Sequence, residues 1–334
     1  MIPARSGPLG APDADAAAPP AADAPLHVPG PEGPWDEVGD RLDDTGRAVV
    51  CTTWGQWLTA VLLDPALRPL LGDDWPRYRQ TPAGTGRMRF AVSRAVVKYA
   101  AAAALDAPAH TLELGRHPGG RPVLRGPGGE VEVSRAHAGE LIVVGVSRTG
   151  PIGVHAQRTG PDASFGPLLE RVCTAREGAL LAALPEDERR ARLLSLWGLK
   201  EACARALGPG AGLSLTGFGF ARDGRGRLVL ATVPGGAQAA AGEWSVAGHL
   251  VQDRYLVSEA HHHPAAPAAS GIPAASAAPA ASAVPAGAAG PAAGVDAGSR
   301  SAAGPLEEQG PGTGALLRFP RPVTSGRGEG RRTP

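Results

Sequence analysis

Apolar positions in the middle of the chain follow the two periods of regular secondary structure. Short apolar runs predict strands at Ala48–Trp54, Leu141–Ser147 and Ile152–Gln157. Apolar residues spaced by three and four predict helices over Gly86–Leu105 and Pro185–Gly208. Further strands are predicted at Leu228–Val233, Trp244–Leu250 and Tyr255–Ser258. This order of elements favours an α+β protein of two comparable lobes over an alternating parallel α/β sheet.

The helix predicted over Pro185–Gly208 carries a carboxylate on its apolar stripe. Trp197 and Glu201 are four residues apart, so a helix places them on the same face. A carboxylate there needs hydrogen bonds, a cation or a metal ion, because burying an unpaired charge is costly. Arg205 follows Glu201 by four residues, and the two could form the ion pair that any solvated helix carries. Both interpretations remain open at this point.

The strand predicted at Ile152–Gln157 has two polar residues on one face. His155 and Gln157 are two residues apart, so they point to the same side of an extended chain. The apolar residues between them point to the other side. An edge strand with one wet face would show the same pattern, so the pair alone does not identify a site.

Three basic residues are weak candidates for ligand binding. Arg89 belongs to a row of cations along the helix predicted over Gly86–Leu105, a pattern typical of a solvated face. Arg121 follows a glycine-rich turn that would let a ligand approach the backbone closely. His137 lies near the tip of a predicted hairpin, where a histidine is more often structural than functional.

Composition separates the central region from both ends of the chain. The 334 residues include 47 Gly and 34 Pro, and most of the prolines lie in residues 1–44 and 263–334. We expect those segments to be disordered, because they have few large apolar residues to bury. Residues 45–150 and 151–262 are then the predicted N-terminal and C-terminal lobes.

Charge and cysteine content exclude several classes of protein. The net charge is +1, which argues against a nucleic-acid-coating protein. Three cysteines without metal-ligand spacing predict reduced thiols in a cytoplasmic protein. No secretion signal and no 18-residue apolar run are apparent, so we expect no membrane association. We expect the protein to be a monomer.

The order and spacing of these features resemble the 4′-phosphopantetheinyl transferases, specifically the large pseudo-dimeric type that activates surfactin synthetase. The main motif comprises Trp197, Lys200, Glu201, Ala202, Arg205 and Gly208. Weaker matches are Arg89-Phe90, Gly120-Arg121-Pro122 and His137. The resemblance implies an α+β fold of two similar lobes related by a pseudo-twofold. Each lobe would be a small, mostly antiparallel sheet with packed helices.

The resemblance implies transfer of 4′-phosphopantetheine from coenzyme A to a serine of an acyl or peptidyl carrier protein. Such carriers serve nonribosomal peptide, polyketide or fatty-acid synthesis. Glu201, aided by Lys200, would help to deprotonate the serine. The implied coenzyme A ligands are Arg89, Arg121, His137, Lys200 and Arg205.

The chain departs from the family at the implied Mg²⁺ site. The family has an Asp-x-Glu pair where this chain has His155-Ala156-Gln157, so the metal ligands would be Glu201, His155 and Gln157. Mg²⁺ prefers charged oxygen ligands, whereas imidazole suits softer divalent metals. Retention of Glu201 and Lys200 favours a working transferase with altered metal dependence. Loss of both strand carboxylates favours an impaired paralogue that binds coenzyme A or a carrier protein without transfer.

Overall fold

The structure is a computed structural model, and six segments of the chain are described. All of them belong to one of the two compact units into which the chain divides. Of the two ends predicted to be disordered, only residues 22–44 and His263 fall within this part. The described residues are 22–118, 120–159, 165–208, 213–223, 228–240 and 242–263.

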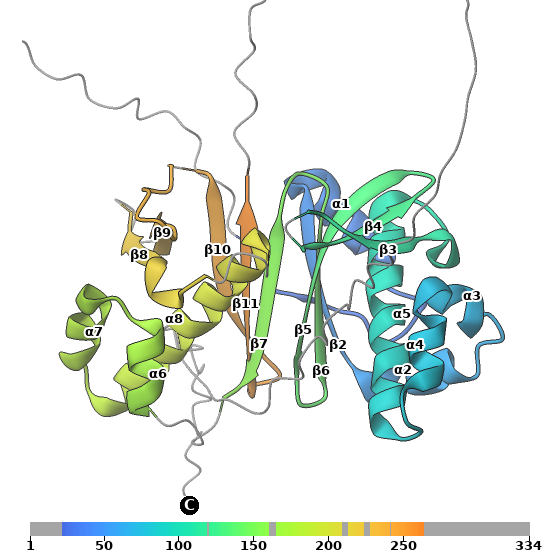
Figure 1. Ribbon diagram of the computed structural model, residues 1–334, viewed down its shortest axis with the longest axis horizontal. Coiled ribbons are helices and arrows are strands. Elements are labelled where there is room, and N and C mark those ends of the chain that lie inside the picture. Colours follow the sequence, from blue (N-terminus) through green and yellow to red (C-terminus); the bar gives the residue numbers. More distant parts are fainter. Residues whose placement is uncertain are drawn as a thin grey trace, which may run out of the picture. The chain divides into compact units, whose positions relative to one another are not determined.

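Helices and strands occur in mixed order along the chain (Figure 1). The α-helices are α1 (Trp35–Thr45), α2 (Trp54–Leu62), α3 (Leu67–Leu71), α4 (Trp75–Gln80), α5 (Thr85–Leu105), α6 (Phe165–Val172), α7 (Ala175–Ala182) and α8 (Glu186–Leu207). Short 3-10 helices are η1 (Gly72–Asp74), η2 (Ala109–Thr111) and η4 (Leu215–Gly217). The strands are β1 (Leu26–His27), β2 (Arg47–Thr53), β3 (Glu113–Arg116), β4 (Pro122–Gly126), β5 (Gly129–Ala138), β6 (Leu141–Ser147), β7 (Ile152–Arg158), β8 (Gly219–Arg222), β9 (Leu228–Thr232), β10 (Trp244–Val251) and β11 (Tyr255–His262).

The strands form separate sheets, which confirms the predicted α+β class. A six-stranded sheet has the order β1-β2-β6-β5-β4-β3, and a three-stranded sheet has the order β10-β11-β7. All neighbours pair antiparallel except β1 and β2, which are parallel. Strands β8 and β9 form a two-stranded sheet. A pseudo-twofold relation between two lobes remains a prediction.

Two apolar layers flank the six-stranded sheet. On one side, Val154 and Ile152 pack with Val143 of β6 and Cys51 of β2, so the two larger sheets face each other through apolar side chains. Helix α5 covers the opposite face of the six-stranded sheet, where Val96 joins a second cluster. Burial of this kind supplies most of the favourable free energy of folding.

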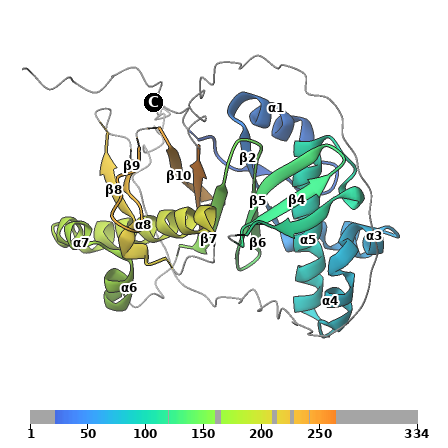
Figure 2. The same ribbon diagram turned by 45° about the horizontal axis from the view of Figure 1, so that its top comes forward.

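The second face of β7 packs against α8 (Figure 2). A Cβ atom on Gly153 would collide with the carbonyl oxygen of Ala202 in α8. Gly198 of α8 has the same role toward β11, because a Cβ there would collide with the hydroxyl of Ser258. Strand β7 is an edge strand of the three-stranded sheet, but the interpretation that one of its faces is wet is wrong, since both faces are buried.

The expectation of disorder up to Asp44 is wrong for residues 22–44, which contain β1 and α1. Val38 and Leu42 of α1 lie four residues apart and are buried together with Leu26 and Val28. Two apolar pairs at the correct spacing suffice to attach a short helix to the core. The segment as a whole is rich in Ala and Pro, so its average composition did not reveal these four apolar residues.

Local sequence signals are confirmed at several other elements. The capping box between Thr174 and Glu177 begins α7. The cysteines Cys51, Cys173 and Cys203 are free. Strand β11 continues to His262, four residues beyond the predicted end at Ser258, because it pairs with β10 along that length. Across the described segments, no helix is long and apolar enough to cross a membrane.

We predict that Leu42→Ala lowers the free energy of unfolding by about 2–5 kcal/mol, because it leaves a cavity under α1. Leu63→Ala is the matched control, since Leu63 is 76% exposed and its loss should change little. Urea denaturation of both variants measures the difference. Equal, small effects would show that the N-terminal segment does not pack on the core.

Candidate functional site

Helix α8 presents the central residues of the candidate site along one stripe. Trp197 donates from its indole Nε1 to Glu201 Oε1 at 3.3 Å. Burial lowers the pKa of Arg205, and the charge of Glu201 one turn away partly opposes that shift. Glu201 is thus held between an indole donor and a guanidinium. Its carboxylate has partial but not complete compensation from α8 itself.

His155 and Gln157 meet this stripe from β7, as their predicted shared face requires. The His155 ring centroid lies 5.4 Å from that of Trp197. His155 Nε2 lies 3.2 Å from Gln157 Oε1, and Gln157 Nε2 donates to the carbonyl of Leu194 at 2.9 Å. Both side chains are buried. Three of the four side-chain polar atoms of the pair therefore bind each other or α8.

These residues do not fit a magnesium ion. Gln157 Oε1 is occupied by His155, and burial followed by the charge of Arg205 lowers the pKa of His155 to about 3. Glu201 is the only carboxylate among the three predicted ligands. No group of three or more His, Cys, Asp or Glu side chains suited to a metal occurs among the described residues. Mg²⁺ requires oxygen ligands, preferably charged ones, in near-ideal octahedral geometry.

Four arginines from three elements gather beside this stripe, and we call them the arginine cluster. They are Arg89 and Arg94 of α5, Arg135 of β5 and Arg205 of α8. Burial lowers the pKa of Arg135 to about 9, and the charges of Arg94 and Arg205 contribute to that shift. Arg135 still carries its charge at neutral pH. Arg205 Nη1 donates to the Arg135 backbone carbonyl at 3.1 Å, which joins α8 to β5.

His137 lies within the field of the arginine cluster. His137 is exposed in part, but desolvation of its ring by the surrounding protein lowers its pKa, and the charges of Arg135, Arg205 and Arg89 lower it further. Ser93 Oγ lies 3.0 Å from His137 Nε2 and also accepts a hydrogen bond from Arg135. A neutral His137 that accepts from Ser93 at Nε2 carries its proton on Nδ1, where it can donate to an anion.

The cluster holds more positive than negative charge. Asp74 forms an ion pair with Arg94 at 2.8 Å, and Glu201 stands near Arg205. Among the described residues, Arg205 Nε is buried without a hydrogen-bond partner. Four guanidinium groups facing two carboxylates favour an added anion, because a phosphate would satisfy free donors and offset the excess charge.

Lys200 does not join this cluster, contrary to its predicted roles beside Glu201 and coenzyme A. Its ammonium is fully buried, donates to the Val172 carbonyl at 2.7 Å and pairs with Glu177 at 2.6 Å. Successive helix positions differ in direction by about 100°, so Lys200 points to α6 and α7 while Glu201 lies on another side of α8, beside Trp197. Lys200 holds three helices together.

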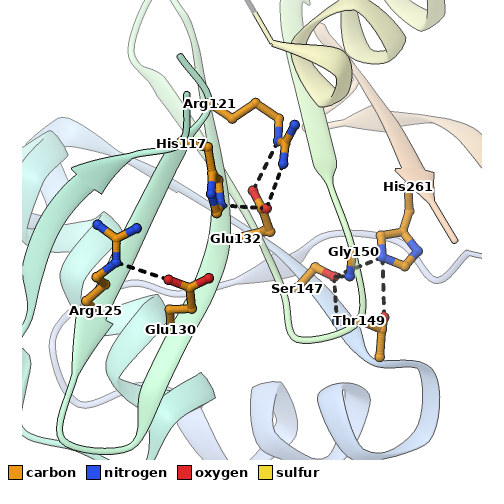
Figure 3. A network of polar contacts seen from close by, with 9 residues as sticks. All are labelled: His117, Arg121, Arg125, Glu130, Glu132, Ser147, Thr149, Gly150 and His261. Atoms are coloured by element: carbon orange, nitrogen blue, oxygen red, sulfur yellow. Dashed lines mark hydrogen bonds and ion pairs between the residues drawn. The ribbon is translucent and has the colours of Figure 1, made fainter. Parts of the chain in front are cut away.

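Arg121 also lies apart from His137. Its guanidinium forms a bidentate ion pair with Glu132, and His117 Nε2 lies 2.8 Å from the same carboxylate (Figure 3). Glu132 and His137 are five residues apart on β5, which separates them by about 16 Å along the strand. The structure thus brings together Arg89, His137 and Arg205 but not Arg121.

Sequence interpretation missed Ser93 and Arg135 as members of the site and treated Arg94 as part of a solvated face. One signal was available for Arg135, because it precedes His137 by two residues and shares its face of β5. Ser93 and Arg94 had no comparable signal. Their side chains enter the site only through the packing of α5 on β5.

The sequence of this part of the chain is similar to that of known proteins. Residues 151–258, which contain β7, α8 and the first half of β11, match the sequence model of the 4′-phosphopantetheinyl transferase superfamily. This part of the chain is a 4′-phosphopantetheinyl transferase superfamily domain. A protein of Synechocystis sp., provisionally named a 4′-phosphopantetheinyl transferase, is 28% identical over 163 residues. The match covers 45% of this chain and 65% of that protein.

We predict that Lys200→Met lowers the free energy of unfolding by about 3–5 kcal/mol, because it strands the Glu177 carboxylate in the interior. The double variant Lys200→Met with Glu177→Gln should recover much of that loss, since no charge is then unpaired. Guanidinium denaturation provides the measurement. A Lys200→Met protein of unchanged stability would argue that Lys200 is free to act in the site.

Proposed function

We propose that this protein transfers 4′-phosphopantetheine from coenzyme A to a serine of an acyl or peptidyl carrier protein. The main support is the arginine cluster beside Glu201. It offers excess positive charge next to a carboxylate, as phosphoryl-group transfer requires. The match of residues 151–258 to the superfamily supports the same reaction class.

Coenzyme A carries a pyrophosphate and a 3′-phosphate, and both are suitable ligands for the arginine cluster. Guanidinium groups bind phosphate oxygens through paired N–H donors. Arg135 is partly buried, and Arg205 has a buried Nε without a hydrogen-bond partner among the described residues. Both guanidinium groups therefore have donors that are partly shielded from water. His137 adds a neutral donor at Nδ1. In the proposal these three residues hold the phosphates, while Arg89 binds at the exposed rim.

Glu201 is the group that would accept the serine proton. The serine oxygen forms a bond to the β-phosphorus while the bond from that phosphorus to the bridging pyrophosphate oxygen breaks. The proton passes to Glu201, and 3′,5′-adenosine bisphosphate leaves with the bonding electrons. Trp197 positions the carboxylate by its indole hydrogen bond. Arg205 would stabilise the negative charge that develops on the leaving oxygen.

A second candidate function is binding of coenzyme A or a carrier protein without transfer. The neutral pair of His155 and Gln157 at the family's metal position favours this alternative. Both functions share the arginine cluster, so coenzyme A binding does not separate them. Intact mass of a carrier protein after incubation with coenzyme A does, because transfer adds the mass of phosphopantetheine.

Several finer assignments belong to the same proposal. These are membership of the large pseudo-dimeric type, lobes at residues 45–150 and 151–262, a monomeric state and a cytoplasmic location. The arrangement of one long helix beside antiparallel strands in each half supports the two-lobe assignment. The cytoplasm is also where coenzyme A and reduced cysteines such as Cys51 and Cys203 would be expected together.

We predict that Arg135→Gln weakens coenzyme A binding by about 10- to 100-fold, because it removes charge-assisted hydrogen bonds to phosphate. Arg125→Gln is the matched control, since Arg125 pairs with Glu130 on the exposed surface of the six-stranded sheet. Arg121→Gln should behave like this control. Calorimetry with coenzyme A and dephospho-coenzyme A compares all three variants. Equal affinities for Arg135→Gln and Arg125→Gln would place the phosphates elsewhere.

We also predict that Glu201→Gln abolishes most carrier modification while leaving coenzyme A affinity within about threefold, because it removes a proton acceptor and no phosphate donor. A kinetic assay by intact mass of the carrier measures transfer, and calorimetry measures binding. Full transfer activity in Glu201→Gln would exclude Glu201 as the base. Absence of transfer in the unmodified protein with several carriers would favour the second candidate function.

A further inference from the structure

His155 and Gln157 stand where the family has its metal-binding carboxylates, so the charge of bound phosphates must be neutralised by other groups. We infer that this protein binds the phosphates of coenzyme A without a divalent ion, because a neutral His155–Gln157 pair and the guanidinium groups of Arg135 and Arg205 take the place of the metal and its carboxylates. This inference rests on the proposed function. It concerns the binding site and does not depend on whether transfer follows.

Hydrogen bonding fixes the orientation of the pair. Gln157 Nε2 donates to the Leu194 carbonyl, which turns Gln157 Oε1 toward His155. An amide oxygen accepts only, so His155 Nε2 must carry the proton of the bond. His155 Nδ1 is buried without a partner among the described residues, so a second proton there would be an unpaired buried charge, and the ring is neutral with its lone pair on Nδ1. The oxygen of Gln157 is used within the protein.

The electrostatic surroundings disfavour a cation at this position. Arg205 opposes a positive charge on His155, and the Arg135 carbonyl holds the Arg205 guanidinium nearby. A divalent ion bound at His155 Nδ1 would face the same repulsion with twice the charge. Glu201, the one carboxylate of the predicted ligand set, already accepts from Trp197 and stands near Arg205.

The net charge of this chain's three residues, without a metal ion, nevertheless equals that of three carboxylates with a bound dication. Three carboxylates and one divalent cation sum to one negative charge. Neutral His155, neutral Gln157 and ionised Glu201 also sum to one negative charge without any ion. Loss of only the carboxylates, with the metal still required, would instead leave a dication with one charged ligand. The observed set is therefore balanced as it stands, and phosphate charge is left to the arginine cluster.

The first experiment measures binding to the unmodified full chain. Calorimetric titration with coenzyme A in EDTA and in millimolar magnesium should give dissociation constants that agree within about threefold. Manganese titration followed by electron paramagnetic resonance should detect no stoichiometric binding site at submillimolar concentration. Coenzyme A binding that requires magnesium, or a stoichiometric manganese site, would overturn the inference.

The second experiment restores the acidic pair by changes that alter charge more than shape. His155→Asp with Gln157→Glu places two carboxylates beside Glu201, and His155→Asn is the matched control of the same size without them. In EDTA the double variant should bind coenzyme A at least about tenfold more weakly than His155→Asn, because carboxylates repel phosphate. Magnesium should restore that loss in the double variant and leave His155→Asn unchanged. Equal magnesium dependence in both variants would contradict the inference.

The outcomes separate this inference from the proposed function. Coenzyme A binding that depends on magnesium in the unmodified protein would refute the metal-free site and leave the transferase proposal intact. Absence of coenzyme A binding at millimolar concentration in both buffers would refute the proposed function, and the inference with it. Should the double variant fail to fold, the calorimetric and manganese titrations of the unmodified protein still decide the question.

Discussion

Direct contact between the backbones of α8 and β7 is the constraint on which the candidate site depends. Gly153 has no side chain, so the Ala202 carbonyl of α8 can lie against the strand. This close approach brings the stripe of Trp197 and Glu201 over the polar face of β7. A larger residue in place of Gly153 would force the helix outward, because packed interiors absorb little added volume. The glycine thus sets how closely α8 approaches the strand that carries His155.

The second requirement is a set of cations contributed by different elements. Helix α5 provides Arg89 and Arg94, β5 provides Arg135, and α8 completes the group with Arg205. Concentrating guanidinium groups costs free energy through mutual repulsion and desolvation, as the lowered pKa of Arg135 shows. The folded protein tolerates this cost because the large apolar clusters on both sides of the six-stranded sheet hold the elements in place. An anionic ligand would relieve it.

Sequence patterns predicted the elements better than the directions of individual side chains. Helical spacing predicted α5 and α8, and strand alternation placed His155 and Gln157 on one face, because these periods are properties of the backbone. The same reasoning failed for Lys200, whose long side chain turns to Glu177. The prediction for Arg121 failed because its guanidinium forms an ion pair with Glu132. Ion pairs between distant positions are decided by packing, which a single sequence does not display.

The His155–Gln157 pair bears on whether the site is a degraded version of a metal centre. Random loss of metal ligands inside a protein would leave buried polar groups without partners, each at a cost of about 1–3 kcal/mol. Gln157 instead uses its amide nitrogen on Leu194 and its oxygen on His155. Within the pair, only His155 Nδ1 lacks a partner among the described residues, and the charge of Arg205 acts on its ring. A pair satisfied by the protein itself, at an unchanged site charge, is therefore more consistent with a replaced mode of phosphate neutralisation than with a lost one.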